Sequence, residues 1–359
     1  MTEPQQVVRA STPAQWLTVI PYLVGFPPRE SVVVLGLGGE NGKRVQLTLR
    51  VDAPPPDVAG QLAASLVKPL QDNGVRAVQF VLYRDASGPV DTADQAVYDG
   101  FHDALGAAFT WRDAIVVRAD RWFSLPPCAN ALCCPPGGVA VPPPDARTEA
   151  ELVYAGKSLA ESREAIAATL HGDNPKDLRK ITRLCEVVED EFIDAVVAGP
   201  AAVRRWGRDL RDEWRDVLIA PATGELDPRF VARFLVGCTW LPIRDAASQV
   251  ADLHRDAANA RLRELTRRAP KDLVAAPATV LGLIASLQGD GCLANIAFDR
   301  ALETQPDYRF AQMLSYGLAH GVRVPDDMLR TQRDPLAPLA SGRRKKPSRK
   351  RGARQQRAS

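Results

Sequence analysis

The stretch PYLVGFPPRESVVVL, residues 21–35, decides how the first half of this chain folds. Its first part is rich in proline and glycine, which predicts a loop that starts at Pro21, after a short helix over about residues 11–20. Its second part leads into Val32–Leu37, a run of β-branched and apolar residues that predicts a buried strand. We therefore expect the N-terminal half to be built around this loop and this strand.

The segments that follow alternate between strand and helix patterns. Residues 45–51 alternate apolar and polar side chains, which predicts a strand that forms an antiparallel hairpin with the first. Two amphipathic helices and two further strands complete the order β-β-α-β-α-β, with helices over about 57–72 and 92–108 and strands over 75–83 and 114–118. Right-handed crossovers would make the second, third and fourth strands parallel, with the first strand beside the second.

Strand direction in this mixed α/β sheet brings one set of residues to a single edge. Open α/β sheets bind ligands beyond the carboxyl ends of their strands, so we expect a ligand site there. Carboxylates and guanidiniums at strand ends are typical of acid–base chemistry, or they mark where strands leave the core. The candidate residues are Gly25, Phe26, Arg29, Ser31, Tyr83, Asp85, Arg118, Asp120 and Trp122.

A loop rich in Pro, Gly and Cys, residues 126–138, precedes a triple proline at 142–144 and predicts a domain boundary. We place the α/β domain at 1–145 and an all-α helical domain at 146–333. Apolar residues recur there at helical spacing. The expected helices cover about 146–170, 178–196, 203–217, 228–238, 243–268, 276–288, 291–304 and 307–320.

The cysteine loop is the only candidate metal site. Cys128, Cys133 and Cys134 supply three thiols, whereas structural zinc takes four ligands, and two of these thiols are adjacent. We therefore predict no bound zinc and no cofactor. The remaining readings are a packed structural loop or a reactive thiol.

A helical hairpin over about 275–308 resembles the tetratricopeptide pattern. Gly282 and Ala294 are small residues where two antiparallel helices would touch, and Phe298 would fill the space beside them. Pro306 would end the second helix. The pattern is compatible with a peptide-binding groove or with an ordinary helical hairpin.

Charge is divided unevenly along the 359 residues. Residues 341–359 contain nine basic and no acidic residues, whereas the remainder holds 37 basic and 43 acidic residues, a net charge of −6. We expect 334–359 to be a disordered basic tail, with at most weak, non-specific contact to nucleic acid through 341–359. No transmembrane segment, secretory signal or amphipathic anchor stands out, so we expect a cytoplasmic protein with no membrane contact.

Three motifs resemble the signatures of an actinobacterial family, Domain of Unknown Function 4192. The first is Pro21-Tyr22-Leu23-x-Gly25-Phe26-x-Pro28-x-x-Ser31-x-Val33-x-Leu35. The others are Trp122-x-Ser124 with Cys128-x4-Cys133-Cys134-Pro135, and the segment Ala294–Pro306–Tyr308–Ala311. The resemblance covers about residues 12–330. It implies a cytosolic bacterial protein and no catalytic residues; Pro27 stands where the family pattern has a polar residue or His.

Two function classes follow from these patterns. The first is a non-enzymatic protein that binds a small molecule or a protein partner at the sheet edge and has a regulatory role. The alternative is an enzyme acting at the same edge, with Tyr83, Asp85, Arg118, Asp120 and Cys128 as its reactive residues. An enclosed pocket with converging carboxylates and arginines would favour the enzyme.

Overall fold

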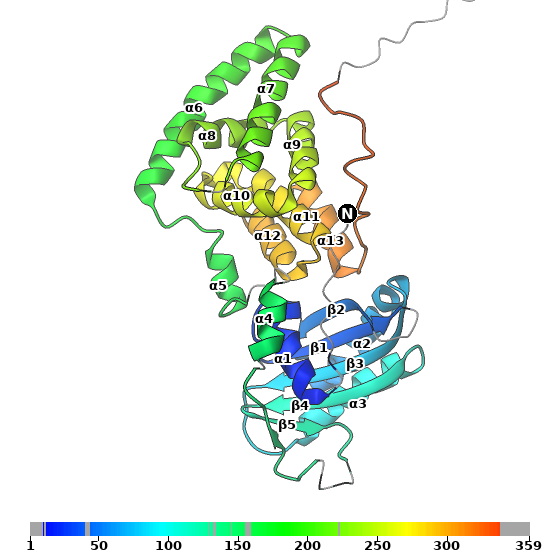
Figure 1. Ribbon diagram of the computed structural model, residues 1–359. Coiled ribbons are helices and arrows are strands. Elements are labelled where there is room, and N and C mark those ends of the chain that lie inside the picture. Colours follow the sequence, from blue (N-terminus) through cyan, green and yellow to red (C-terminus); the bar gives the residue numbers. More distant parts are fainter. Residues whose placement is uncertain are drawn as a thin grey trace, which may run out of the picture.

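The computed structural model describes residues 10, 12–39, 44–128, 130, 132, 134–144, 146–154, 159–221 and 223–337. The basic tail predicted over 341–359 lies outside these residues. The described chain folds into an α/β part, shown in blue and cyan in Figure 1, and a helical part, shown in green to orange.

The α/β part is a mixed sheet with the strand order β2-β1-β3-β4-β5-β6. Its strands are β1 (Ser31–Gly38), β2 (Arg44–Asp52), β3 (Val75–Arg84), β4 (Thr110–Arg118), β5 (Arg121–Ser124) and β6 (Val139–Ala140). β1 is antiparallel to both β2 and β3, and β3 is parallel to β4. The predicted fold class and strand directions are confirmed.

The predicted strand order is only partly right. β1 lies between β2 and β3, so β2 forms the edge of the sheet and runs in the same direction as β3 without touching it. All eight residues of β1 are buried, which a central position explains better than an edge position. Two short strands were not predicted. β5 contains Trp122 and precedes the cysteine loop, and β6 follows that loop.

Helices cover both faces of the sheet (Figure 1). α2 (Pro56–Asp72) and α3 (Thr92–Gly106) pack on one face, against Val34, Phe80 and Leu82. α1 (Pro13–Val24) packs on the other, against Val33 and Val81. We call these the α3 face and the α1 face. Alternate residues of each strand point to opposite faces, so neighbouring residues at a strand end belong to different environments.

Helix α1 is longer than predicted. Thr12 caps its N-terminus in a capping box with Gln15, and the helix continues through Pro21 to Val24. Pro21 removes one backbone donor. The extra turn buries Tyr22 and Val24, and Gly25 ends the helix in a left-handed conformation with φ of 95°. The loop of the opening stretch is therefore Gly25–Glu30.

The helical part is built around one apolar core. Its helices are α4 (Ala146–Tyr154), α5 (Arg163–Ala168), α6 (Pro175–Val197), α7 (Pro200–Ile219), α8 (Pro228–Gly237), α9 (Leu241–Leu253), α10 (Arg255–Arg268), η1 (Lys271–Leu273), α11 (Ala275–Leu287), α12 (Gly291–Thr304) and α13 (Arg309–Ala319). Asn174 and Asp227 cap α6 and α8, and each precedes a proline at the first helical position.

Two expected helices are each divided into two. The helix expected over 146–170 is divided into α4 and α5, because Ser162 caps a new helix. α4 packs on α1, where the Tyr22 hydroxyl donates to the Glu149 carboxylate at 2.8 Å. The helix expected over 243–268 breaks at His254. The break follows buried Asp252, which pairs with Arg255 at 2.6 Å and Arg330 at 2.8 Å.

The helical hairpin predicted over about 275–308 packs through the small residues named for it. A Cβ at Gly282 would lie 2.3 Å from the Phe298 ring, so only glycine fits there. Ala294 and Phe298 are fully buried. Described structure also extends past 333 to Ala337, because Leu336 is buried against Gly207.

Polar contacts join the helical part to the β1–β2 side of the sheet. Asn73 donates to the Gly321 carbonyl at 2.8 Å, and the guanidinium of Arg323 donates to the carbonyl of Gln46. Gln46 is the extra residue at a bulge in β2 and has no partner in β1. Ala160 donates to the Gly25 carbonyl at 2.9 Å. The linker before α5 is therefore held against the loop that opens the sheet.

Candidate functional site

The loop Gly25–Glu30 contacts the segment that follows β3, as the strand directions predicted. Arg29 pairs with Asp85 at 3.1 Å, and the Asp85 backbone N–H donates to the Glu30 carboxylate at 2.7 Å. Ser31 lies directly opposite Tyr83 in the sheet. Glu30 takes a left-handed φ of 37°, a strained conformation for a residue with a side chain.

On the α3 face, the charged residues of this edge bind one another. Arg84 pairs with Asp94 at 2.9 Å and with Glu30 at 3.1 Å. Arg118 pairs with Asp91 at 2.8 Å and makes a short contact with Asp94. Asp94 is 2% exposed at its side chain and Arg118 is 7% exposed, so the centre of this ion-pair network is closed to solvent.

Asp94 is the centre of this network, although its position in the sequence did not mark it as a site residue. Its signal was the spacing Asp91-x-x-Asp94 at a helix start, where the Asp91 carboxylate accepts from the Asp94 N–H at 2.9 Å. That hydrogen bond and the Arg118 guanidinium hold the pKa of Asp91 below its ordinary value. Arg118 therefore anchors the start of α3 to the end of β4.

On the α1 face, the same edge carries buried polar atoms that lack hydrogen-bond partners. Within the described part of the chain, Ser31 Oγ, Tyr83 Oη and Arg50 Nε have none. Ser31 is fully buried and Tyr83 is 8% exposed. Burial raises the pKa of Tyr83, so its hydroxyl stays protonated at neutral pH. Buried polar groups in proteins are nearly always paired, so three together in one place require an explanation.

A hollow of about 260 Å³ is lined by one of these residues, Arg50, whereas Ser31 and Tyr83 do not line it. It lies between the α1–β1 loop, the end of β2 and the start of α5, and it has both apolar and charged walls. Its lining residues are Phe26, Pro27, Arg29, Arg50, Asp52, Ser162, Arg163 and Glu164. Arg50 pairs with Asp52 at 2.6 Å and lies over the Phe26 ring at 5.8 Å, whereas Arg163 pairs with Asp299 at 2.7 Å.

Only some of the predicted edge residues line the hollow. Phe26 and Arg29 line it, and Gly25 orients the loop that carries them. Arg50 and the start of α5 were not predicted. Residues 48, 50 and 52 of β2 point away from the α3 face, which Leu47, Leu49 and Val51 cover, so their polar side resembles a solvent-exposed face. Nothing in the sequence indicates that residues 162–164 lie over that side.

Asp120 and Trp122 do not line the hollow. Asp120 lies in the turn between β4 and β5, where its backbone carbonyl accepts from Val141 at 2.8 Å and its side chain is exposed. Trp122 lies opposite Val117 in β5 and packs on the α1 face. The chain reverses into a hairpin here, which carries Trp122 back into the sheet.

The loop that contains the cysteines is tied to β5. Arg121 donates to the carbonyl of Gly138 at 2.7 Å, and a Cβ at Gly138 would meet the Phe123 ring at 2.6 Å. Cys128 is exposed and Cys134 is half-buried, whereas Cys133 lies outside the described residues. Among the residues that the structure describes, no group of three or more His, Cys, Asp or Glu side chains could hold a metal ion.

Comparison with known proteins identifies the family. Residues 13–324 match the family model described as Domain of unknown function (DUF4192). No curated protein and no solved structure shows a significant match to this chain. Across the described ranges, no helix has both the length and the apolar character needed to cross a membrane. Because the family model covers most of the 359 residues, this chain belongs to the DUF4192 family.

Proposed function

We propose that this protein is a non-enzymatic binding protein that holds a small anionic ligand in the hollow on the α1 face of the sheet edge. The observation that carries the proposal is that Arg50, whose buried Nε has no described hydrogen-bond partner, lines the hollow together with Arg29 and Arg163. An unpaired buried polar group destabilises a fold by about 1–3 kcal/mol, so a ligand that accepts a hydrogen bond from Arg50 would recover that energy.

The charge around the hollow favours an anion. Among the lining residues, Arg29, Arg50 and Arg163 contribute three guanidiniums against the carboxylates of Asp52 and Glu164. Each guanidinium also pairs with a carboxylate, of Asp85, Asp52 and Asp299 respectively, so a bound anion would share these arginines with them. The pKa of Glu164 is lowered by its backbone and side-chain hydrogen bonds and, to a smaller extent, by Arg163 and Arg50. Arginine binds carboxylate and phosphate groups through its planar fork of N–H donors.

Size and apolar surface narrow the class of ligand. A volume of about 260 Å³ lies below the usual range for ligand pockets, about 300–1,000 Å³. Phe26 and Pro27 form an apolar wall on one side. We therefore expect a small carboxylate or phosphate compound with an apolar portion that lies against Phe26.

A binding role also agrees with the state of the residues considered for catalysis. Arg118 is held by Asp91 and Asp94, and Asp85 is paired with Arg29. Tyr83 has no neighbouring base within hydrogen-bonding distance among the described residues. A general acid or base has to reach its substrate with a proton to exchange, whereas Arg118 and Asp85 are held in ion pairs and Tyr83 is buried without a base.

The test is a thermal-shift screen of the full-length protein with a panel of small carboxylates and phosphates, followed by calorimetry on the compounds that bind. A ligand at about 100 times its Kd stabilises the fold by about 2.7 kcal/mol. We expect Arg50→Ala to abolish that shift and Arg50→Lys to weaken it. Arg76→Ala should leave it unchanged, because Arg76 is an exposed strand arginine away from the hollow.

Two results would contradict the proposal. One is a panel in which no compound shifts the melting temperature. The other is an equal shift for wild type and both Arg50 variants, provided that their circular dichroism matches wild type. Conversion of a bound compound to a new product, followed by mass spectrometry, would identify the enzyme considered as the alternative.

A further inference from the structure

Helix α6 lies along the outer margin of the helical part (Figure 1). One side of it is buried: Ile181, Cys185 and Val188 belong to the core of this part, where α6 packs on α7 and α8. The opposite side is exposed and has no neighbouring element over it among the described residues. It runs about 27 Å from residue 176 to residue 194.

The exposed side is divided by charge. Its first half is basic and its second half is acidic. The basic half consists of Lys176, Arg179, Lys180 and Arg183, and the acidic half of Glu186, Asp190 and Asp194. No ion pair to any of these seven side chains occurs within the described part of the chain, whereas Asp177 and Glu191 at the sides of the same helix pair with Arg268 at 2.8 Å and Arg229 at 2.6 Å.

This division places like charges next to each other along the helix. Residues four apart are neighbours on a helix surface, and like charges at that spacing destabilise it. α6 has four such pairs: Lys176–Lys180, Arg179–Arg183, Glu186–Asp190 and Asp190–Asp194. A helix folded for solvent exposure alone would gain from mixing the two signs, so the separation points to a partner with the complementary pattern.

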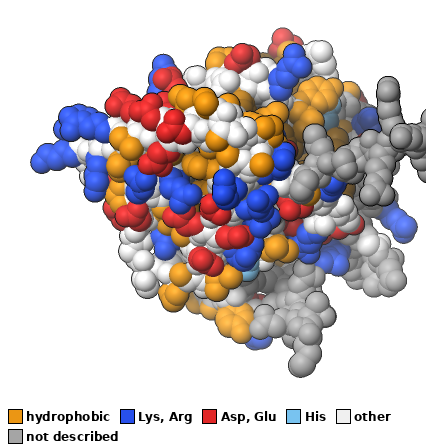
Figure 2. Space-filling view, turned by 90° about the horizontal axis from the view of Figure 1, so that it is seen from above, with side chains coloured by type: hydrophobic (Ala, Val, Ile, Leu, Met, Phe, Trp, Pro, Cys, Tyr) orange, Lys and Arg blue, Asp and Glu red, His pale blue; other side chains and the backbone are white. Residues whose placement is uncertain are grey.

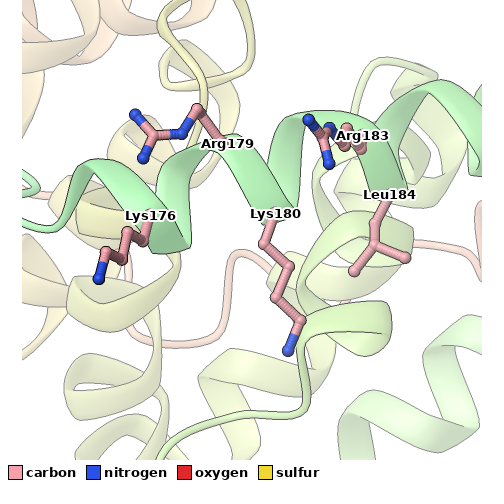
Figure 3. A pocket seen from close by; sticks show the side chains of 5 residues that line it. All are labelled: Lys176, Arg179, Lys180, Arg183 and Leu184. Atoms are coloured by element: carbon pink, nitrogen blue, oxygen red, sulfur yellow. The ribbon is translucent and has the colours of Figure 1, made fainter.

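The basic half surrounds a surface hollow of about 570 Å³, together with Leu184 (Figure 3). In Figure 3 the side chains of Lys176, Lys180 and Leu184 extend from one side of α6, and Arg179 extends from the other. Figure 2, seen from above, shows basic side chains projecting at the left margin and acidic side chains gathered beside them, where α6 lies in Figure 1. The surface is thus open to a partner.

We propose that the exposed side of α6 binds the same side of α6 in a second copy of this chain, with the two helices antiparallel. A two-fold axis near residue 185 would place Lys176 opposite Asp194 of the other copy and Arg179 opposite Asp190. Arg183 would lie opposite Glu186 near the centre. Each contact occurs twice, which makes the surface self-complementary in the way that a two-fold dimer requires.

The acidic half distinguishes this partner from a polyanion. A nucleic-acid strand that followed α6 would meet Glu186, Asp190 and Asp194 after the basic half, and its phosphates would be repelled. Val187, which is 48% exposed, lies between the two halves and supplies an apolar contact at the centre of the pair. A single helix pair buries little area, so the dimer is expected to be weak and sensitive to salt.

The experiment is sedimentation velocity on the full-length protein at about 100 μM. We expect dimers at an ionic strength of about 0.1 M and at least about tenfold weaker association at about 1 M, where the Debye length falls from about 10 Å to about 3 Å. The acidic-α6 variant carries Lys176→Glu, Arg179→Glu and Arg183→Glu. The basic-α6 variant carries Glu186→Lys, Asp190→Lys and Asp194→Lys. Each variant alone should be monomeric, and the two mixed should form a heterodimer.

A charge-swap variant with all six substitutions separates this geometry from net charge, which it leaves at the wild-type value. It should dimerise with itself and not with wild type, because its acidic first half would face the acidic half of the wild-type helix. Wild type that stays monomeric at low salt would overturn the proposal. Self-association of both the acidic-α6 and the basic-α6 variant would also overturn it. So would a charge-swap variant that pairs with wild type as well as with itself.

Discussion

The two faces of the same sheet edge differ in how their buried polar side chains are paired. On the α3 face, Arg84 and Arg118 both pair with the buried carboxylate of Asp94, and of these three residues only Arg118 has a buried polar atom, Nε, without a described partner. On the α1 face, Ser31 Oγ and Tyr83 Oη are buried without hydrogen-bond partners among the described residues, and Arg50 on the same face lines a hollow. Adjacent strand residues thus belong to a structural network on one face and to a candidate binding site on the other. Charge alone is a poor guide to which face binds a ligand.

The largest effect is expected from opening the network on the α3 face. Arg118→Ala would leave the buried carboxylate of Asp94 without one of its two guanidiniums, and breaking a buried ion pair costs about 3–5 kcal/mol. Urea denaturation should show a loss in this range for the free energy of unfolding, and Arg76→Ala should change it by less than about 0.5 kcal/mol. A loss below about 1 kcal/mol for Arg118→Ala would mean that the network is not structural.

A smaller effect with the opposite sign is expected on the α1 face. Tyr83→Phe removes a buried hydroxyl that has no described partner, so the free energy of unfolding should stay the same or rise by about 0.5–1 kcal/mol. Tyr22→Phe is the matched control, because its hydroxyl donates to Glu149, and it should lose about 1 kcal/mol. Denaturation curves that show an equal loss for both variants would remove the contrast between paired and unpaired hydroxyls.

Acid should weaken the ion-pair network on the α3 face through Asp91. Folding lowers the pKa of Asp91, so Asp91 stabilises the fold above the ordinary aspartate pKa of about 4, and that stabilisation is lost as pH falls through the lower folded-state value. Asp91 is half exposed, so the difference should be about 0.5 kcal/mol. Between pH 6 and about pH 3, wild type should lose this much more stability than Asp91→Asn. Parallel stability curves for the two proteins would contradict the assignment.

The smallest expected effect concerns a thiol beside the hollow. Burial raises the pKa of Cys292 to about 11, and its Cβ lies 3.9 Å from where a Cβ of Gly25 would be. At about pH 8, iodoacetamide should modify exposed Cys128 well before Cys292, as read by peptide mass spectrometry. A ligand in the hollow should slow modification of Cys292 further and leave Cys128 unchanged. Equal protection of both thiols would place the ligand elsewhere.

Much of the sheet edge could be predicted because strand direction is a local property. The opening stretch, residues 21–35, and the alternation of strands and helices after it were enough to bring Arg29, Ser31 and Asp85 together. The position of β1 between β2 and β3 could not be read in the same way. It depends on which strand buries both faces, and that is a property of the assembled sheet.

The content of the candidate site was less predictable than its place. Arg118 was selected for its position at a strand end, yet Asp91 and Asp94, at the start of the preceding helix α3, pair with it. Arg50 was overlooked because the polar side of β2 resembled a solvated face until Ser162–Glu164 covered it. In both cases the partner belongs to a different helix or strand, and side-chain patterns within one element carry no information about that contact.

The Arg323–Gln46 contact has a consequence for how the chain is synthesised. Gln46 is the bulged residue of the edge strand β2, and its carbonyl is taken by an arginine that lies 277 residues later in the chain. At a synthesis rate of about 5–20 residues per second, Arg323 is synthesised roughly 15–60 s after Gln46, so this part of the sheet edge stays uncovered for that time. During that interval an uncovered strand edge can pair with other nascent chains. During this interval the polar residues Arg44, Thr48 and Arg50 of β2 disfavour pairing of the edge with another chain. In the native fold Arg323 covers the edge at Gln46.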